Sequence, residues 1–462
     1  MGKPAFIVPL VVASGLFLEN LDGTVLATSL PAMALDLGQD PIQLKLVFTS
    51  YLLSLAIFIP ISGWCADRFG ARNVFRVAMA VFTLGSLGCA FSSSLMEFVV
   101  ARIIQGLGGA MMTPVGRLIV LRAVPRSELV QAMAWLTIPA LIGPVMGPIV
   151  GGFITTHFHW RWIFWINLPI GILGIVLASL YIKPSVLQKQ QPLDLIGLAL
   201  SGLGMASVVT GVTIAGQEVL PIYGVVGLIL AGLGLLYGYW WHARRLSHAI
   251  LDMSLFQISS FRSAALGGLV FRIGMGATPF LLPLMLQVGF GMDALQSGLL
   301  TFSLAVGAFA MKFSARSILR QFGFRNVLIF NAILGALSLG AMGFIGADTP
   351  YGWIYGLLLA SGFLRSLQFT SLNTLVYADV PPEKLSSATS LSAVMQQLST
   401  SFGVAVGALI LESLRSARGE LTLLHSDFTI AFVLVAIISV AALLLHLPLS
   451  PAAGNEVSGH KG

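Results

Sequence analysis

Residues 43–72 read QLKLVFTSYLLSLAIFIPISGWCADRFGAR. The first part of this stretch carries a single charge, Lys45, whereas Asp67, Arg68 and Arg72 gather at its end. An apolar run of about 20 residues matches the hydrocarbon layer of a bilayer, which is about 30 Å thick, because a helix rises about 1.5 Å per residue. A short basic loop after such a run is typical of the cytoplasmic side. The stretch therefore predicts a membrane-crossing helix that ends in a cytoplasmic loop.

The composition of the whole chain agrees with this prediction. Of the 462 residues, 56% are hydrophobic and only 9% are charged, and the mean hydropathy is +0.92. A soluble domain carries about a quarter charged residues, and disorder requires low hydrophobicity, so both classes are excluded. The 50 glycines suit membrane helices, where small residues let backbones approach closely. We therefore predict an all-α polytopic membrane protein.

The same length criterion, applied along the chain, predicts fourteen transmembrane helices. Six lie in the first part of the chain, six in the last part, and two between these groups. The approximate spans are 6–34, 43–65, 72–92, 96–122, 127–156, 163–182, 195–214, 221–241, 262–289, 296–316, 325–346, 352–378, 385–412 and 428–447.

The distribution of Lys and Arg predicts the orientation of these helices. With a cytoplasmic N-terminus, the inner loops hold fourteen basic residues and the outer loops hold four. We therefore expect both termini in the cytoplasm and the protein in the inner or plasma membrane. The net charge of +7 is then a topology signal, and no nucleic-acid partner is expected. The inner set is Arg68, Arg72, Arg76, Arg122, Arg126, Lys183, Lys189, Arg244, Arg245, Arg262, Arg316, Arg320, Arg325 and Lys384, and the outer set is Lys45, Arg161, Arg415 and Arg418.

An internal repeat indicates how the helices are grouped. Residues 69–72, Phe-Gly-Ala-Arg, correspond to residues 322–325, Phe-Gly-Phe-Arg, and residues 124–129 correspond to residues 380–385. Parallel six-helix halves are one transporter design, with the substrate site near the middle of the membrane between them. The predicted units are a six-helix bundle at 1–184, two additional helices at 185–250, a second six-helix bundle at 251–449 and a disordered cytoplasmic tail at 450–462.

Several motifs resemble those of one transporter family. Residues 63–72, GWCADRFGAR, look like the inner-loop signature of the major facilitator superfamily, and residues 102–106, RIIQG, are similar to its fourth-helix signature. Residues 143–152, GPVMGPIVGG, resemble the antiporter signature of its fifth helix. Residues 21–25, LDGTV, and 160–171, WRWIFWINLPIG, look like marks of its fourteen-helix drug:proton antiporter subfamily.

Two further stretches look like the MdtD-type branch of multidrug transporters, namely residues 110–117, AMMTPVGR, and residues 271–274, FRIG. The resemblance implies alternating access and proton-coupled export of small organic molecules. It also implies an inner gate in which charges close the cytoplasmic side; the alternative is that these charges only determine the topology. The gate residues are Gly63, Asp67, Arg68, Gly70 and Arg72.

A pair of opposite charges is predicted inside the membrane, where a charge is costly unless it is paired or hydrated. Asp22 and Arg102 fall at similar depths in the first and fourth helices. Burial disfavours a charged carboxylate and a nearby guanidinium favours it, so a movement that makes or breaks the pair can load or release a proton. We predict Asp22 as the proton carrier, Arg102 as its partner and Gln105 as a polar neighbour. The alternatives are a static ion pair and direct contact with the substrate.

Four more charges, Glu19, Arg117, Arg272 and Arg365, are predicted inside the membrane. Glu19 lies one turn before Asp22 and is a second proton site, a substrate contact or a solvated side chain. Arg117 either reaches the cytoplasmic interface or lines the cavity. Arg272 and Arg365 either line the cavity or bond carbonyls within the second half. The charged side chains predicted inside the membrane are more cationic than acidic, which favours an anionic or metal-chelate substrate.

The predicted fifth helix contains glycines and prolines at regular spacing. Gly147 and Gly151 give it a smooth face for close packing, and Pro144 and Pro148 favour bending. Two interpretations stay open, a bendable helix that closes the outer leak path between the halves and tight packing alone. The full set is Gly143, Pro144, Gly147, Pro148, Gly151 and Gly152.

The sequence contains no phosphate-binding loop for ATP and no hydrolase or zinc-protease motif. An ion gradient is therefore the expected energy source, and an enzyme or a sensor is disfavoured. We predict a monomeric proton-coupled exporter of small organic molecules that needs no cofactor and whose partners are substrate, protons and lipid. The alternative is an exporter of an anionic metabolite or metal chelate, such as a citrate- or siderophore-like molecule. Residues 143–152 argue against a proton-coupled importer.

Overall fold

The computed structural model describes residues 3–39, 45–184, 192–215, 220–246, 248–292, 294–346, 348–419 and 423–460. These residues form helices joined by short loops and include no strand, which confirms the all-α class. A helix satisfies its backbone hydrogen bonds internally, and an apolar chain in lipid has no other partner for them.

The helices of the first half run in order along residues 3–181. They are α1 (Lys3–Leu37), α2 (Lys45–Phe58), the 3-10 turn η1 (Ile59–Ile61), α3 (Ser62–Phe69), α4 (Ala71–Phe91), α5 (Leu95–Ala123), the 3-10 turn η2 (Arg126–Glu128), α6 (Leu129–His157), α7 (Trp162–Trp165) and α8 (Asn167–Tyr181). The inserted pair is α9 (Leu195–Ile214) and α10 (Ile222–Ala243).

The second half begins with the 3-10 turn η3 and includes two π-helical turns, η4 and η5. Its elements are η3 (Met253–Gln257), α11 (Ser259–Arg262), η4 (Ser263–Gly267), α12 (Gly268–Gly276), α13 (Thr278–Leu284), η5 (Met285–Gly289), α14 (Ala294–Met342), α15 (Tyr351–Ala378), η6 (Pro382–Lys384), α16 (Leu385–Arg418), α17 (His425–Val440) and α18 (Leu443–His446), followed by α19 (Asn455–Ser458).

The helices are compatible with fourteen membrane crossings. Among the described residues, eleven helical stretches are long and apolar enough to cross a membrane. One of them lies in α14, which covers the predicted spans 296–316 and 325–346 and changes direction at Gly323. The helices α6 and α15 occupy two more predicted spans, 127–156 and 352–378.

The internal repeat is also present in the backbone. Gly70 and Gly323 have positive φ angles of 83° and 71°, a conformation that favours glycine because it has no Cβ. Each of them joins two helices at corresponding positions of the two halves. Farther along, η2 and η6 are both single 3-10 turns that follow a proline and precede a long helix.

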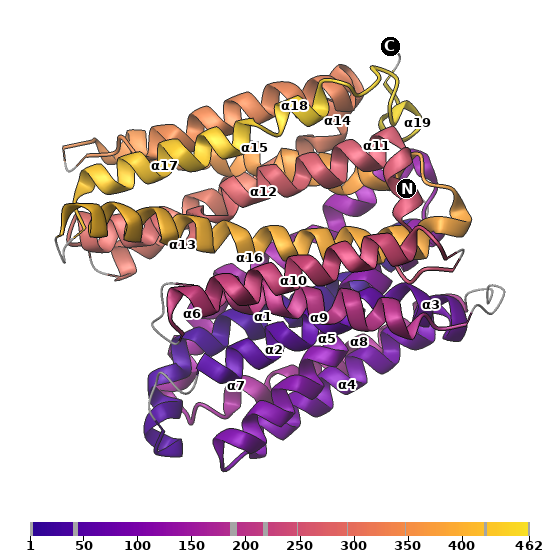
Figure 1. Cartoon of the computed structure of the whole chain (residues 1–462), viewed down its shortest axis with the longest axis horizontal. Helices are drawn as coiled ribbons and strands as arrows, with labels where there is room; N and C mark the ends of the chain where they lie inside the picture. Colours follow the sequence, from indigo (N-terminus) through magenta and orange to yellow (C-terminus); the bar gives the residue numbers. More distant parts are fainter. Residues whose placement is uncertain are drawn as a thin grey trace.

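The two halves form two lobes, and both chain termini lie at one end of the bundle (Figure 1). We call this end the termini end. The first half, in indigo and purple, lies below the second half, in orange and yellow. The inserted helix α9 packs against α2 of the first half and α16 of the second. At Gly202 of α9 the backbones are so close that a Cβ would lie 3.0 Å from the carbonyl oxygen of Ile57.

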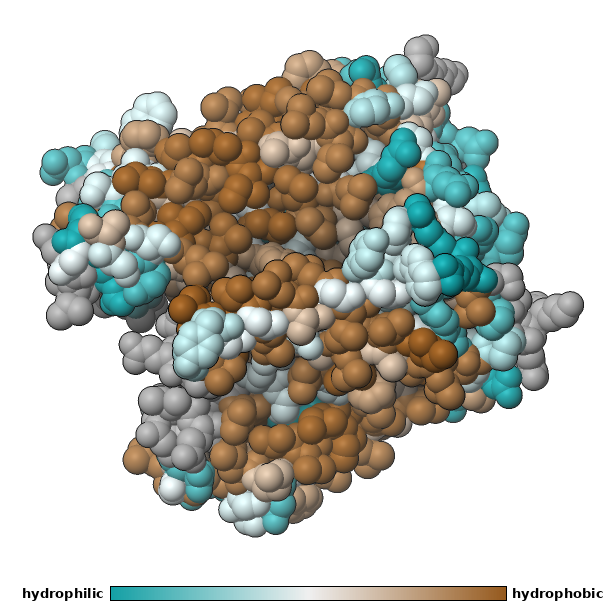
Figure 2. Space-filling view, in the orientation of Figure 1, coloured by the Kyte–Doolittle hydropathy of each residue, from teal (hydrophilic) through white to brown (hydrophobic). Residues whose placement is uncertain are grey.

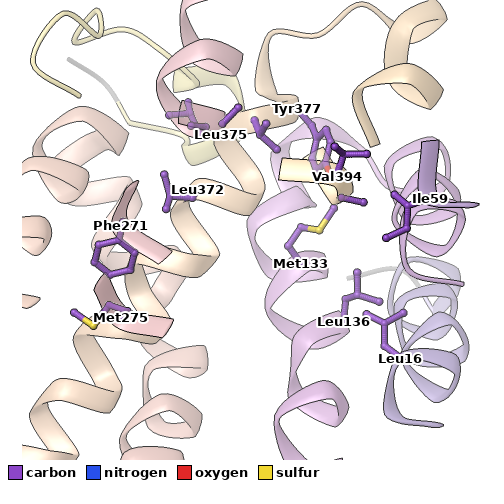
Figure 3. Close-up of a cluster of buried hydrophobic side chains, with 14 of the residues drawn as sticks. Leu16, Ile59, Met133, Leu136, Phe271, Met275, Leu372, Leu375, Tyr377 and Val394 are labelled. Carbon is purple, nitrogen blue, oxygen red and sulfur yellow. The ribbon is translucent and has the colours of Figure 1, made fainter. Parts of the chain in front are cut away.

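One hydrophobic core joins the two lobes. Figure 3 shows part of it, in which residues of the first half meet residues of the second, and the labelled side chains at this junction are Leu16, Ile59, Met133, Leu136, Tyr377 and Val394. Another core contains Val25, Phe98 and Phe164 and, among the described residues, includes none from the second half. The first half therefore shares its core with the second toward the termini end and has a core of its own toward the opposite end.

Apolar side chains cover the middle of the molecule, and hydrophilic side chains gather toward its ends (Figure 2). Large apolar residues such as Leu230, Phe330 and Trp353 are exposed. A soluble monomer rarely exposes so much contiguous apolar surface, so this belt requires a lipid environment. The chain is a multi-pass membrane protein.

The expectation of a disordered tail is wrong for residues 450–460. Residues 455–458 form the short helix α19, and Val457 and Ser458 are buried. The sequence of this segment is mostly polar, but Val457 joins the shared hydrophobic core, and this burial offsets part of the entropy lost on ordering. Residues 461–462 lie outside the described part of the chain.

Candidate functional site

Local sequence places Arg102 and Gln105 on one face of α5. Ser94 caps this helix, since its side chain accepts a hydrogen bond from the backbone N–H of Glu97 at 3.3 Å. Glycines then let neighbouring helices approach Gln105 closely. A Cβ on Gly85 of α4 would lie 2.6 Å from the backbone of Gln105, so only glycine allows this contact.

Asp22 of α1 is 3% exposed and accepts hydrogen bonds on both carboxylate oxygens. Arg102 Nη1 lies 2.6 Å from Oδ2, and Gln105 Nε2 lies 2.8 Å from Oδ1. The same Arg102 nitrogen also donates to Gln105 Oε1 at 2.6 Å. Asn167 Nδ2 adds a further bond to Oδ1 at 2.9 Å. An ionised carboxylate only accepts hydrogen bonds, so this set of donors matches Asp22 in its charged form.

Arg102 is fully buried and is held from several sides. Its Nε donates to the carbonyl of Val47 at 3.3 Å, and its guanidinium lies 4.3 Å from the ring centroid of Tyr51. Its Nη2 has no hydrogen-bond partner among the described residues. Breaking a buried ion pair by removing one charge costs about 3–5 kcal/mol. The pair is therefore both a strong constraint between α1 and α5 and a place where adding a proton has a large effect.

Asn167 is a site residue that sequence reasoning missed. It is the first residue of α8, is fully buried, and bridges Asp22 to Ser86 of α4, whose Oγ lies 2.8 Å from Asn167 Nδ2. The sequence did contain an indication of this role, since Asn167 belongs to the quoted stretch 160–171 and is an amide within an apolar run. The proton-carrier candidate thus contacts two amides and one guanidinium from two helices other than its own.

Glu19 and Asp22 have different partners. Thr113 of α5 donates to Glu19 Oε2 at 2.8 Å, and the charge of Arg117 attracts Glu19 while that of Asp22 repels it. Arg117 does not extend to the interface, because it is only 6% exposed. Its Nη1 has no hydrogen-bond partner among the described residues. The structure thus rules out the expectation that Arg117 reaches water.

Arg272 and Arg365 both lie near one aromatic ring in the second half. Their guanidinium carbons lie 5.3 and 5.7 Å from the ring centroid of Phe369. Arg272 Nη2 donates to Asn373 Oδ1 at 2.8 Å, and its Nε has no partner within the described chain. The charge of Arg117 also acts on Arg272, so two cations from opposite halves repel each other.

Lys312 of α14 is a buried cation that the sequence analysis also missed. It is 4% exposed, and its ammonium donates to Thr370 Oγ1 at 2.8 Å. Arg272 was selected as a charged residue inside a predicted transmembrane span. The same criterion selects Lys312, since it lies inside the predicted span 296–316. Its position near the end of that span favours a solvated side chain, but the packing of α14 against α15 buries it instead.

The antiporter-like run of α6 packs directly on α1. A Cβ on Gly143 would lie 3.0 Å from Asn20, and a Cβ on Gly147 would collide with Thr24. Thr24 also donates to the carbonyl of Gly143 at 3.3 Å. Gly151 is buried, whereas Gly152 borders open space. The side chains of Pro144 and Pro148 lie outside the described part, so bending of this helix stays a prediction.

Residues of the predicted inner gate contact the second half at the termini end. Asp67 pairs with Arg122 at 3.0 Å and accepts a hydrogen bond from Ser386 of α16. One turn earlier, Ser62 and Ser390 share a hydrogen bond of 2.8 Å. Between these two bonds, Gly63 lies against the backbone of Ser386. This end of the molecule is therefore closed.

The remaining gate residues also have contacts within the first half. The guanidinium of Arg68 lies 5.4 Å from the ring centroid of Trp64, and Arg72 donates to the carbonyl of Ser179 at 2.9 Å. Gly70 provides the turn between α3 and α4. Gly63 and Asp67 contact the other half in this structure.

Replacement of Gly63 by valine is expected to prevent closure of the termini end. Even a Cβ would lie 2.7 Å from both the carbonyl oxygen of Ser386 and Ser390 Oγ, and overpacking of this kind typically costs about 1–3 kcal/mol. Labelling of a cysteine introduced by Ser390→Cys should become roughly tenfold faster in Gly63→Val. Gly234→Val in α10, where a Cβ meets open space, is the control and should not change the rate.

The comparisons with known proteins agree with this geometry. The sequence profile of the Major Facilitator Superfamily matches residues 12–404 and 264–462. Among solved structures, the human organic anion transporter MFSD10 superposes with a TM-score of 0.70 at 15% identity, covering 96% of this chain and 100% of that one. The proton:xylose symporter XylE superposes with a TM-score of 0.67 at 16% identity, covering 97% of both chains. At these identities the likeness shows the fold alone.

Curated relatives match most of the chain. The multidrug resistance protein MdtD of Serratia proteamaculans is 37% identical over 433 residues, which cover 93% of this chain and 90% of that protein. The MdtD protein of Cronobacter sakazakii is 40% identical over 412 residues, with coverages of 87% and 85%. Profile, relatives and fold agree that the protein is a transporter and not an enzyme. The chain belongs to the Major Facilitator Superfamily and, within it, to the family of the MdtD proteins.

Proposed function

We propose that this protein is a proton-coupled exporter that works by alternating access and carries its proton on Asp22. The observation that supports the proposal best is the buried network in which Asp22 accepts hydrogen bonds from Arg102, Gln105 and Asn167. A carboxylate with these partners is stable while it is charged, and a proton on it would remove the charge that holds Arg102. Protonation would therefore loosen the contact of α1 with α5 and α8.

The closed termini end is compatible with the proposed direction of transport, which is export. The termini end is closed by contacts of α3 with α16, and the fourteen inner basic residues support a cytoplasmic location for this end. An exporter in this state has released its substrate outside and is ready to take up a proton there, which fits a charged Asp22. Protonation would then favour opening toward the cytoplasm, where substrate binds and the proton leaves. An importer fits less well, because residues 143–152 resemble the antiporter signature.

Glu19 acts on the proton carrier Asp22 in this scheme. It is half-buried, bonds Thr113 and lies one helical turn from Asp22, whose charge repels it. Because two nearby carboxylates do not titrate independently, a charge change at Glu19 alters proton binding at Asp22. We propose a monomer in the inner membrane with both termini in the cytoplasm, driven by the proton gradient without a cofactor.

A transport assay in proteoliposomes tests this function. Vesicles that contain the purified protein receive a sudden pH gradient and a panel of cationic drugs, organic anions and ferric chelates. Proton-driven movement of at least one substrate class, abolished by a protonophore, supports the proposal. Equal movement with and without the gradient would exclude proton coupling.

The cations of the central region support a second candidate substrate class, organic anions including metal chelates. The charge of Arg117 in the first half acts on Arg272 in the second, and each side chain has a nitrogen without a described hydrogen-bond partner. Two buried like charges are unfavourable, and an anion between them would satisfy both. Arg365 and Lys312 add positive charge to the second half. No Asp or Glu lies within the central part of the described second-half helices.

The variant Arg272→Gln is expected to separate the two substrate classes. Loss of a charge-assisted hydrogen bond should raise KM for an anionic substrate about tenfold or more, because such bonds contribute about 1.5–3 kcal/mol. KM for a cationic drug should stay the same or fall. The control is Arg415→Gln, which removes a surface charge that pairs with Glu412 at 2.8 Å. Equal KM increases for both classes would remove Arg272 from anion recognition.

A further inference from the structure

The C-terminal segment, residues 450–460, is a structured part of the molecule that the transport scheme does not use. Glycines with positive φ, Gly454 and Gly459, both at 70°, flank the short helix α19. Such angles let the chain turn sharply on either side of the helix. Val457 is 2% exposed and Ser458 is 4% exposed, so the segment is packed against the bundle.

The C-terminal segment contacts the first half at the loop before α6. The helix α19 packs against η2 and α6, and Glu456 pairs with Arg126 of η2 at 3.2 Å. This ion pair is largely exposed, so it contributes little by itself. The neighbouring Val457, which is buried in the shared core, provides the larger part of the contact.

The same segment contacts the second half. Gly454 lies so close to α14 and α15 that a Cβ would be 2.7 Å from the ring of Phe324 and 3.2 Å from Leu375. The ring of His460 lies beside Gly323, and its Nδ1 is 3.0 Å from the carbonyl oxygen of Arg320. The C-terminal segment therefore covers the junction of the two halves at the termini end.

Opening of the termini end must disturb this arrangement. Arg126 also donates directly to the carbonyl of Val380 at 3.4 Å, so the two repeat-related loops 124–129 and 380–385 are in contact under the segment. When the halves rotate apart, these loops separate. The helix α19 packs on η2 of the first half and on α14 of the second, so it cannot stay packed on both once the halves separate.

We propose that the C-terminal segment holds the two halves together at the termini end and must detach from one of them each time this end opens. It contacts neither Asp22 nor the central cations, so it acts on the balance between closed and open states and not on the proton site. Removal of the C-terminal segment should increase the population of molecules that are open at the termini end. The burial of Val457 alone accounts for an increase of about tenfold.

Cysteine labelling tests this proposal without substrate or gradient. The probe is Ser390→Cys in a Cys65→Ala background, because Ser390 is fully buried at the closed junction. The maleimide labelling rate is compared between the full chain, a chain that ends after Leu449 and the full chain with Val457→Asp. Both altered chains should label about tenfold faster.

The full chain with Val457→Asp still tests the proposal if the shortened chain does not insert into the membrane, because this substitution changes only one buried contact. Glu456→Gln is the matched control, and its rate should stay within about twofold of the parent because the ion pair is exposed. Unchanged labelling in every altered chain that inserts would overturn the proposal. Because the assay involves no proton movement, this failure is distinguishable from failure of proton coupling.

Discussion

The variant Asp22→Asn is expected to lose proton-driven transport and to keep the exchange of substrate between the two sides of the membrane. Asparagine has the shape of aspartate and still offers an oxygen to Gln105 or Asn167, but it cannot bind and release a proton. In proteoliposomes, uphill transport driven by an imposed pH gradient should fall to the level of protein-free vesicles. Exchange of labelled for unlabelled substrate at equal pH should continue, because this reaction requires no net proton movement.

A second carboxylate on the same helix provides the control. Asp36 accepts hydrogen bonds from Trp160 at 3.0 Å and from Arg161 at 2.5 Å. Burial acts to raise the pKa of Asp36, but these hydrogen bonds and the charge of Arg161 hold that pKa below its usual value, so Asp36 stays charged at neutral pH. Asp36→Asn should leave uphill transport intact. Uphill transport by Asp22→Asn at the rate of the parent would show that the proton travels elsewhere.

Replacement of Arg102 by methionine is expected to have the largest effect on stability. It leaves Asp22 buried without a positive partner, and removal of one charge from a buried pair costs about 3–5 kcal/mol. The loss should appear as a melting temperature that is lower by several degrees in detergent.

The double variant Asp22→Asn with Arg102→Met distinguishes this cause from lost packing. With both charges removed, the melting temperature should recover by at least half of the loss seen in Arg102→Met alone. Arg161→Met, which breaks a partly exposed pair with Asp36, is the control and should lower the melting temperature little. A double variant no more stable than Arg102→Met would mean that packing of the arginine side chain, and not its charge, stabilises this region.

Much of this architecture could be predicted because bilayer thickness constrains each helix. The predicted span 195–214 coincides with α9, and 163–182 matches α7 and α8 together. The pairing of Asp22 with Arg102 could also be predicted, because two opposite charges at similar depth have few other partners in an apolar helix bundle. The turn at Gly323 followed from its correspondence with Gly70 in the sequence repeat.

Other parts of the site depend on packing that no local pattern shows. Asn167 reaches Asp22 because α8 packs against α1, and a single amide in an apolar stretch does not reveal its partner. Lys312 lies near the end of the predicted span 296–316, where a lysine usually reaches water, and it is buried because α14 packs against α15. The order in the C-terminal segment depends on the burial of Val457 in α19, a helix that contacts both halves. Such contacts between distant residues appear only in the folded chain.

Substrate-driven proton movement tests the central claim most directly. Vesicles loaded with a transported substrate and a pH-sensitive dye, with no initial pH gradient and with the membrane potential clamped, are diluted into substrate-free buffer. Antiport through Asp22 predicts that the interior becomes acidic as substrate leaves, and that Asp22→Asn vesicles show no pH change. An interior that becomes alkaline, or that keeps its pH while substrate leaves through the unmodified protein, would contradict antiport.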